Sequence, residues 1–432
     1  MRRPQIGSHR LDRSVKPLLV ASCLAVLVMS CAAPTTVRRP EGFPARAPDI
    51  RVLLAEGRES VMISAGEGLI VSASGGITLL ESPEKCALRI SGGPSNIELM
   101  LEPPGNVAAA QEKVTITPRG AAALSFEDVT FAGSMSIVIG ADGKLMLVNT
   151  VPLETYLEGV LPHEMGDPGA DGFDALKAQA VAARTYALER IEKHPAERFD
   201  VYAGVRDQVY QGLKGRNNHA SVAVNDTRGM VAGNGKGLVK AYYCGCCGGH
   251  TSDIRQVWPK REPADYLSGI PDRDEKSGRA FCRDNRYFRW RYSFTGKELG
   301  DMLRVTLPKT LGIGPSDVGE VLDVRIEGRA PSGRVTAVVI RTTKNEFTVT
   351  GDEIRWVLMA DPVKGRILPS IMFNFDKIME QGRMAFLSIG GGGNGHGVGM
   401  CQSGAIAMSK KGYTYRMILK HYYPGCDVVR AY

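Results

Sequence analysis

Glu164 is the residue whose type and surroundings most favour acid/base chemistry. It lies in residues 163–169, between a helical pattern that begins at Pro152 and should end at Pro162 and a second one over about residues 171–193. We therefore expect a loop pinned at both ends, which can hold a carboxyl group over a cleft. A glutamate partly removed from water there keeps its proton near neutral pH and can act as a general acid. The alternative is that Glu164 only caps the loop by binding neighbouring amides.

Two familiar motifs are excluded around these residues and in the tail. The pair His163-Glu164 begins like the His-Glu-x-x-His of zinc proteases, but the fifth position is Asp167, and Pro162 and Gly166 do not suit a regular helix. The glycine-rich tail contains no Gly-x-x-x-x-Gly-Lys-Ser/Thr and lacks the spacing of a dinucleotide fingerprint. Neither a zinc protease nor a nucleotide site is therefore predicted.

Arg184 is the most informative charge on the second helix. It lies among alanines, where a lone cation is costly unless it is paired. A guanidinium binds carboxylates bidentately, so Arg184 could hold Glu164 in place or bind a carboxylate of a ligand. A structural ion pair with Glu154 or Glu158 is the alternative. The alanines themselves predict close approach by a neighbouring element.

A glycine-rich segment near the C-terminus supplies further candidates. Glycines flank His396, and a helix is expected over about residues 402–411, followed by a shorter one over residues 415–422. Glycine allows close approach of the backbone to a ligand, and a helix start presents free amides. His396 and Gln402 are therefore candidates for ligand contact, although a buried, hydrogen-bonded His396 is an equal alternative.

The cysteines allow either a disulfide or a metal site. Of nine, Cys23 lies in the apolar segment near the N-terminus, and three others cluster at Cys244, Cys246 and Cys247, with Cys282 further on. In an oxidising compartment such a cluster suggests a disulfide, but His250 lies close enough in sequence for zinc. A structural zinc site would draw on Cys244, Cys247, His250 and Cys282.

The N-terminus resembles a bacterial lipoprotein signal. Five basic residues precede an apolar run over residues 18–29, which ends at Ser30 before Cys31. Residues 1–30 would be removed and Cys31 would carry lipid, so the protein would be anchored to a membrane and exported to the cell envelope. The alternative is an ordinary secretory signal, cut near Ala32 or Ala33.

Removing this segment also changes the charge balance. It holds five Lys or Arg against one Asp, and so supplies four of the eight formal positive charges. The remainder is mildly basic and has no long basic run, which argues against nucleic-acid binding. An anionic polymer remains compatible.

The elements that position these residues predict an α+β fold. Residues 31–48 are a Pro-rich tether, and residues 49–124 consist of short β-prone runs separated by Gly, Pro and Asn, which predicts a β-rich N-terminal domain. Strands at residues 134–140 and 144–149 flank an Asp-Gly turn, which predicts a hairpin. The helices described above follow, so residues 125–432 should form a larger mixed domain.

Four blocks in this larger domain resemble the stage II sporulation protein D (SpoIID/LytB) family. They occur in the family's order and cover roughly residues 125–432. The blocks are Val-Pro-Leu-Glu-Thr-Tyr-Leu-Glu-Gly-Val at 151–160 with His-Glu-Met at 163–165 and the alanine-rich 175–186, Asp-Gln-Val-Tyr-Gln-Gly at 207–212, Cys-Gly-Gly-His-Thr at 247–251, and Gly-His-Gly-Val-Gly-Met-Cys-Gln-Ser-Gly-Ala at 395–405.

The resemblance implies a lytic transglycosylase of peptidoglycan glycan strands, with Glu164 as its acid/base. Such an enzyme cleaves between muramic acid and glucosamine units without water and gives 1,6-anhydro products, with no cofactor required. The LytB side of the family implies the alternative, a non-catalytic enhancer of a cell-wall amidase. The partners that the resemblance implies are glycan strands, the membrane through the lipid anchor, and an amidase or division proteins.

The resemblance also extends the set of candidate sugar contacts. Arg184 could meet the lactyl carboxylate of a muramic acid, and Gln179 and Tyr186 could bind sugar hydroxyls or be packing residues. Gln208 and Tyr210 join them by their place in the second block. The match also implies that Cys247 and Cys282 lie close together, as a disulfide first and as part of a zinc site second. The chain departs from many relatives around residues 205–208, where others often carry cysteines.

Overall fold

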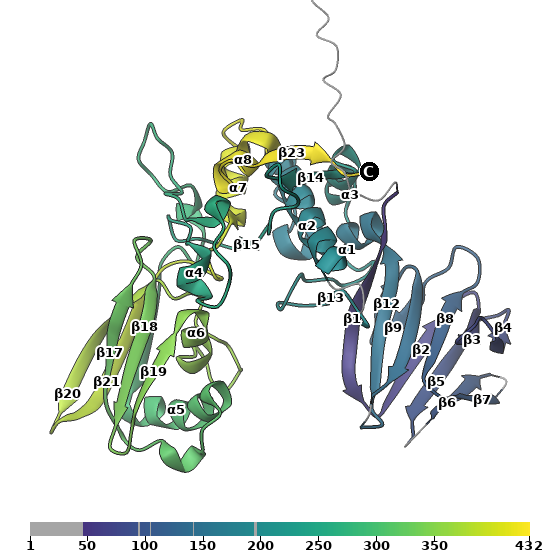
Figure 1. Cartoon of the computed structure of the whole chain (residues 1–432), viewed down its shortest axis with the longest axis horizontal. Helices are drawn as coiled ribbons and strands as arrows, with labels where there is room; N and C mark the ends of the chain where they lie inside the picture. The colour runs from purple at the N-terminus through teal and green to yellow at the C-terminus, as the bar shows by residue number, and fades with distance from the viewer. Residues whose placement is uncertain (1–45, 94–95, 104, 141, 194–196) are drawn as a thin grey trace, which may run out of the picture. The chain divides into compact units, whose positions relative to one another are not determined.

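The fold is α+β, as the sequence predicts, with a β-rich N-terminal part followed by mixed helices and strands (Figure 1). The computed structural model describes residues 46–432, apart from residues 94–95, 104, 141 and 194–196. The expected signal segment, the expected lipidation site Cys31 and all but the last three residues of the tether lie outside the described residues.

Two sheets make up the N-terminal part. One has the strand order β13-β1-β12-β11-β8-β3-β4 and the other β10-β9-β2-β5-β6-β7. The first contains β13 (Val201–Tyr202), β1 (Asp49–Arg58), β12 (Leu145–Pro152), β11 (Ser134–Ile139), β8 (Lys113–Pro118), β3 (Leu69–Ala73) and β4 (Thr78–Ser82). The second contains β10 (Val129–Phe131), β9 (Leu124–Phe126), β2 (Ser60–Ala65), β5 (Cys86–Gly92), β6 (Ile97–Glu102) and β7 (Asn106–Ala110).

The two sheets share one hydrophobic core. Alternate residues of β2, β5 and β6 are buried, as expected for strands with one face against a core. The predicted hairpin is present as β11 and β12, which pair antiparallel. These strands also pair with β8 and β1, so the first sheet continues across the boundary expected at residue 124.

Helix α2 lies between two buried clusters. It spans Phe173–Lys193 and follows a short 3-10 helix, η1 (Ala170–Gly172). Leu176, Ala180 and Ala183 belong to the core of the N-terminal sheets, whereas Ala178 and Ala182 belong to a second core. The close approach that the alanines predict is confirmed, because α1 (Leu153–Met165), α3 (Asn218–Asp226), α7 (Gln402–Ser409) and α8 (Tyr415–Tyr422) all pack on α2 (Figure 1).

The rest of the chain builds the second core. Two three-stranded antiparallel sheets have the orders β16-β21-β20 and β17-β18-β19, and two pairs of short strands complete the fold. The strands are β14 (Met230–Gly233), β15 (Tyr243–Cys244), β16 (Trp290–Thr295), β17 (Val321–Arg329), β18 (Val335–Thr342), β19 (Glu346–Thr350), β20 (Phe373–Glu380), β21 (Arg383–Gly391), β22 (Met400–Cys401) and β23 (Asp427–Arg430). The helices are α4 (Ile254–Val257), α5 (Gly296–Leu311), α6 (Ile354–Val357), η2 (Asp265–Leu267), η3 (Phe281–Asp284), η4 (Pro315–Asp317) and η5 (Gly351–Glu353). None of the helices in the described part of the chain combines the length and apolar character needed to cross a bilayer.

Candidate active site

Glu164 lies in the last turn of α1, not in a loop. The prediction that Pro162 ends this helix is wrong, because α1 runs through Pro162 to Met165. Proline removes one amide donor, but the helix continues for one more turn, and the amide of Gly166 closes it on the carbonyl of Pro162 at 3.0 Å. Gly166 has φ 65°, a left-handed value that favours glycine and ends the helix. A regular helix therefore fixes the backbone of Glu164.

Two hydrogen bonds hold the Glu164 carboxyl group. The backbone amide of Val209 donates to Oε1 at 2.8 Å, and the side-chain amide of Gln402 donates to Oε2 at 3.2 Å. The side chain is partly buried, and burial raises the pKa of Glu164 above its ordinary value. The two hydrogen bonds and the charge of His163 oppose this rise without cancelling it. The raised pKa and the two fixed oxygens make Glu164 a better general acid than an exposed glutamate.

Gln208 fixes the segment that carries the Val209 amide. It is fully buried, and its Oε1 accepts from the hydroxyl of Tyr156 at 3.0 Å. Its Nε2 donates to the hydroxyl of Tyr243 at 2.8 Å and to the carbonyl of Ala183 at 3.4 Å. All of these partners belong to the chain, so Gln208 positions Val209 and does not contact a sugar.

Tyr210 supports the same segment from the side of the N-terminal sheets. It is 4% exposed, and its hydroxyl donates to Oδ1 of Asn149 at 2.9 Å. Gly159 of α1 lets the Tyr210 ring pack against this helix, because a Cβ there would lie 2.3 Å from the carbonyl oxygen of Gly212 and 2.8 Å from the Tyr210 ring. The expected sugar contact through Tyr210 is therefore replaced by a packing role.

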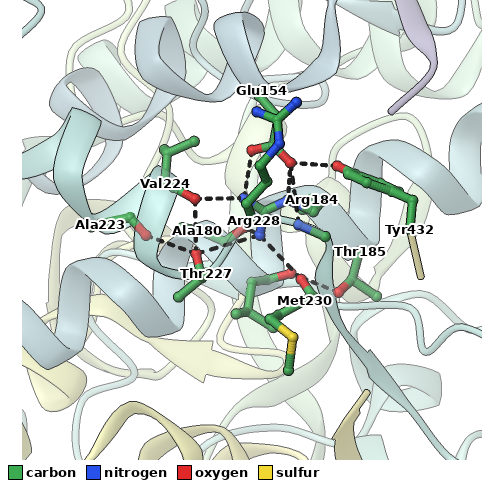
Figure 2. A network of polar contacts seen from close by, with 12 residues as sticks. Glu154, Ala180, Arg184, Thr185, Ala223, Val224, Thr227, Arg228, Met230 and Tyr432 are labelled. Carbon is green, nitrogen blue, oxygen red and sulfur yellow. Dashed lines mark hydrogen bonds and ion pairs between the residues drawn. The ribbon is translucent and has the colours of Figure 1, made fainter. Parts of the chain in front are cut away.

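Arg184 forms a structural ion pair and lies too deep for a substrate. Its guanidinium is fully buried and donates to both carboxylate oxygens of Glu154, at 3.0 and 2.7 Å (Figure 2). It also donates to the carbonyls of Val224 and Met230, at 3.2 and 3.1 Å. The hydroxyl of Tyr432 donates to the same carboxylate (Figure 2). The structure therefore favours the ion-pair alternative for Arg184 over contact with a ligand.

Arg184 also controls the ionisation of its partner. Burial alone would raise the pKa of Glu154, but the hydrogen bonds and charge of Arg184, together with the hydrogen bonds from Tyr432 and Gly229, outweigh burial and lower that pKa below its usual value. Glu154 is therefore a buried carboxylate, which distinguishes it from Glu164 in the same helix.

The other two candidates on α2 differ in accessibility. Gln179 is fully buried, and neither polar atom of its side chain has a hydrogen-bond partner among the described residues. It therefore has no route to a sugar in this structure. Tyr186 is partly buried and its hydroxyl donates to Asp207, which in turn accepts from the amide of Tyr202 at 2.8 Å. Tyr186 thus helps to hold the start of the segment that reaches Glu164.

His396 packs within the protein, and the neighbouring glycines serve its own chain. The imidazole lies 4.9 Å from the Trp258 ring, its Nδ1 accepts from the amide of Val398 at 3.0 Å, and burial lowers its pKa to about 4. At Gly397, φ is 79° and a Cβ would lie 2.1 Å from a nitrogen of Arg334. These glycines allow other segments of the chain to pack closely against this one. The close approach that was expected for a ligand is made by the protein itself.

The cysteines group differently from either expectation. The sulfur atoms of Cys247 and Cys282 lie 3.7 Å apart, and both thiols are free, whereas a disulfide requires about 2.05 Å. Of the predicted zinc ligands, Cys247 and Cys282 come together, but their neighbours are Asp272 and Cys401. Cys244 is buried beside Cys401 in the β15–β22 pair but is not part of this group, and burial raises its pKa to about 12. His250 directs Nδ1 at the carbonyl of Thr251.

Sequence reasoning missed three groups: the backbone amide of Val209 beside Glu164, and the side chains of Asp272 and Cys401 beside Cys247. The Val209 amide is a backbone group, so no residue type announces it. Asp272 lies outside every motif, and Cys401 is far in sequence from its neighbours. Only the order of the family blocks at residues 207–212 and 395–405 pointed to segments that meet near Glu164.

Comparison with known proteins places the chain in a family. Residues 141–233 match the SpoIID family model, described as "Stage II sporulation protein". A protein of Brachyspira hyodysenteriae without a characterised function is 32% identical over 303 residues, which cover 70% of this chain and 73% of that protein. Stage II sporulation protein D of Bacillus subtilis is 28% identical over 300 residues, covering 66% of this chain and 76% of its own length. The chain belongs to the SpoIID family.

A relative with a different name also resembles this chain. The amidase enhancer of Bacillus subtilis is 26% identical over 289 residues, 62% of this chain, but the match covers only 39% of that longer protein. Residues 254–399 match a second model, described as a domain of unknown function. That stretch runs from α4 to the glycines around His396 and includes Asp272 and Cys282.

Proposed function

We propose that this SpoIID protein is a peptidoglycan lytic transglycosylase, with Glu164 as its single acid/base. The observation that carries the proposal is the Glu164 carboxyl group, whose pKa is raised by burial while two hydrogen bonds fix both of its oxygens. A group held in this way keeps its proton to a higher pH than an exposed glutamate does, and its two hydrogen bonds fix its orientation.

The proposed reaction needs only this carboxyl group. Glu164 gives its proton to the glycosidic oxygen between muramic acid and glucosamine as the bond from that oxygen to C1 of muramic acid breaks. The C6 hydroxyl of the same muramic acid attacks C1, and the Glu164 carboxylate takes the hydroxyl proton. The product is a 1,6-anhydro sugar, no water is consumed, and Glu164 is again protonated. Hydrolysis of such bonds usually needs a second carboxylate, which this route avoids.

A role in the bacterial cell wall agrees with the names of the relatives. One is a stage II sporulation protein and another is an amidase enhancer. We propose that the chain is exported and held at the cell envelope by lipid on Cys31, where glycan strands would be its substrate. Amidases or division proteins would be its partners.

A second candidate function is a non-catalytic enhancer of an amidase. The similarity to the amidase enhancer of Bacillus subtilis favours it. In that case the Glu164 pair with Gln402 would maintain a binding surface, and the chain alone would leave glycan strands intact.

A product assay separates the two functions. The full-length chain is incubated with glycan strands freed of their peptides, and the products are analysed by mass spectrometry. The variants are Glu164→Gln and, as a matched control, Glu192→Gln, which makes the same change at an exposed position of α2. Circular dichroism confirms that each variant is folded.

The two proposals predict different outcomes. A transglycosylase gives anhydro-muramic ends, which are one water lighter than hydrolysis products, with wild type and with Glu192→Gln. Loss of a general acid typically lowers the rate by about a hundred- to ten-thousand-fold, so Glu164→Gln should give almost none. If folded wild-type protein releases nothing but stimulates an added amidase, the enzymatic proposal is wrong and the enhancer is supported.

A further inference from the structure

Four buried side chains outside the candidate active site converge on one point. They are Cys247, which follows β15, Asp272, Cys282 of η3 and Cys401 of β22. One ligand atom of each lies within 4.8 Å of those of the other three. Residues so far apart in sequence meet only because the fold brings three separate segments together.

The separation of the Cys247 and Cys282 sulfur atoms fits a metal ion better than a disulfide. The sulfur atoms of Cys247 and Cys282 lie 3.7 Å apart. In a tetrahedral site with zinc–sulfur bonds of about 2.3 Å, two sulfur atoms lie about 3.8 Å apart, whereas a disulfide needs about 2.05 Å. Thiolates and carboxylates both bind zinc, and structural zinc sites have four protein ligands in a tetrahedron.

Backbone amides donate hydrogen bonds to the cysteine sulfurs, which would stabilise them as thiolate ligands. The amides of Cys247 and Gly404 both donate to the sulfur of Cys401, at 3.2 and 3.3 Å. The amide of Gly249 donates to the sulfur of Cys247 at 3.4 Å. Such outer contacts orient metal ligands and stabilise their charged forms.

Asp272 is held in the same way. Its side chain is fully buried, and its Oδ1 accepts from the hydroxyl of Tyr422 at 2.8 Å. Nε2 of His421 lies 3.5 Å from the same oxygen without a hydrogen bond to it. Its Oδ2 lies 3.0 Å from the sulfur of Cys247. One oxygen is therefore fixed by the protein while the other faces the cysteines.

A buried cation beside the cluster is a second, independent indication. Arg334 is fully buried and donates to the carbonyls of Cys247 and His250, each at 2.7 Å. Its Nε has no hydrogen-bond partner among the described residues. A buried guanidinium is costly without negative charge nearby, and a metal site made of thiolates and a carboxylate supplies it.

We propose that Cys247, Asp272, Cys282 and Cys401 bind one Zn²⁺ ion tetrahedrally, with Arg334 offsetting the excess negative charge of the ligands. The site is structural, because four protein ligands fill the coordination sphere and all four are buried. It ties the start of α7 to the second core. Cys401 directly precedes Gln402, so the ion would also help to fix the residue that donates to Glu164.

Metal content tests the proposal directly. The full-length chain, purified without a metal-binding tag or chelator, should contain one zinc per chain by inductively coupled plasma mass spectrometry. Cys282→Ser and Asp272→Asn should each contain clearly less, whereas Cys86→Ser, which changes a buried cysteine of β5, should contain as much as wild type. Cobalt exchanged for zinc should give the visible absorption of a tetrahedral thiolate site, independently of any activity.

Several results would overturn the proposal. Folded wild-type protein that takes up neither zinc nor cobalt would contradict it, as would a Cys247–Cys282 disulfide found by mass spectrometry of the non-reduced protein. Equal loss of zinc from Cys86→Ser and Cys282→Ser would show that the metal binds elsewhere. Zinc that is lost in Cys246→Ser but kept in Asp272→Asn would contradict the assigned set of ligands.

Discussion

The side-chain amide of Gln402 donates a hydrogen bond of 3.2 Å to Oε2 of Glu164, across 238 positions of sequence. The contact joins the first residue of α7 to the last turn of α1. Both helices pack on α2, so α2 fixes the positions of the two helices that hold the carboxyl group. This relationship links the fold to the proposed chemistry.

Replacing Gln402 should shift the pH dependence of glycan cleavage upward. The amide stabilises the charged form of Glu164, so Gln402→Met removes a group that lowers the pKa, and the pKa of Glu164 rises further. A general acid works in its protonated form, and activity falls as pH rises through its pKa. The falling limb of the rate profile should therefore move to higher pH. Lys410→Met, which introduces the same side chain at an exposed position just after α7, should leave the limb in place. A limb unmoved in Gln402→Met would contradict the contact.

Removing Arg184 should strongly destabilise the protein. Arg184→Met keeps much of the side-chain volume but leaves the buried carboxylate of Glu154 without its ion pair. Breaking a buried pair in this way typically costs about 3–5 kcal/mol in the free energy of unfolding. Denaturant unfolding followed by circular dichroism measures the change.

Two further variants test this explanation. Glu154→Leu added to Arg184→Met should recover part of the loss, because no charge is then left unpaired. Arg325→Ala removes an exposed partner of Glu346 and should change stability little. A single variant Arg184→Met as stable as wild type would show that the ion pair is not needed.

A methyl group at Gly159 should disturb the support of the Val209 amide. In Gly159→Ala the new Cβ would lie 2.3 Å from the carbonyl oxygen of Gly212, so α1 and the segment 207–212 must move apart. Overpacking of this kind typically costs about 1–3 kcal/mol, and we expect glycan cleavage to fall as well. Gly204→Ala, where nothing lies within 4 Å, should be neutral in both thermal unfolding and cleavage. Equal behaviour of the two variants would contradict the packing described.

The sequence predicted the elements better than it predicted their contacts. The β-prone runs and the Asp-Gly turn correctly predicted the hairpin of β11 and β12, and the alanines of α2 correctly predicted close approach by a neighbouring element. Pro162 was misleading because one lost amide bond does not stop a helix whose apolar face is already packed. Residue type alone favours a substrate role for Arg184 or Gln208 as readily as a structural one. Only their burial, which depends on the whole fold, decides between the two.

The central claim concerns the proton on Glu164, and the yield of 1,6-anhydromuramic ends tests it most directly. The full-length chain and its Glu164→Gln variant, at equal concentration and with equal thermal stability, are given the same peptide-free glycan strands. We expect anhydro ends to accumulate with wild type and to fall by at least about a hundredfold with the variant. Anhydro ends formed equally by both proteins would show that another group supplies the proton.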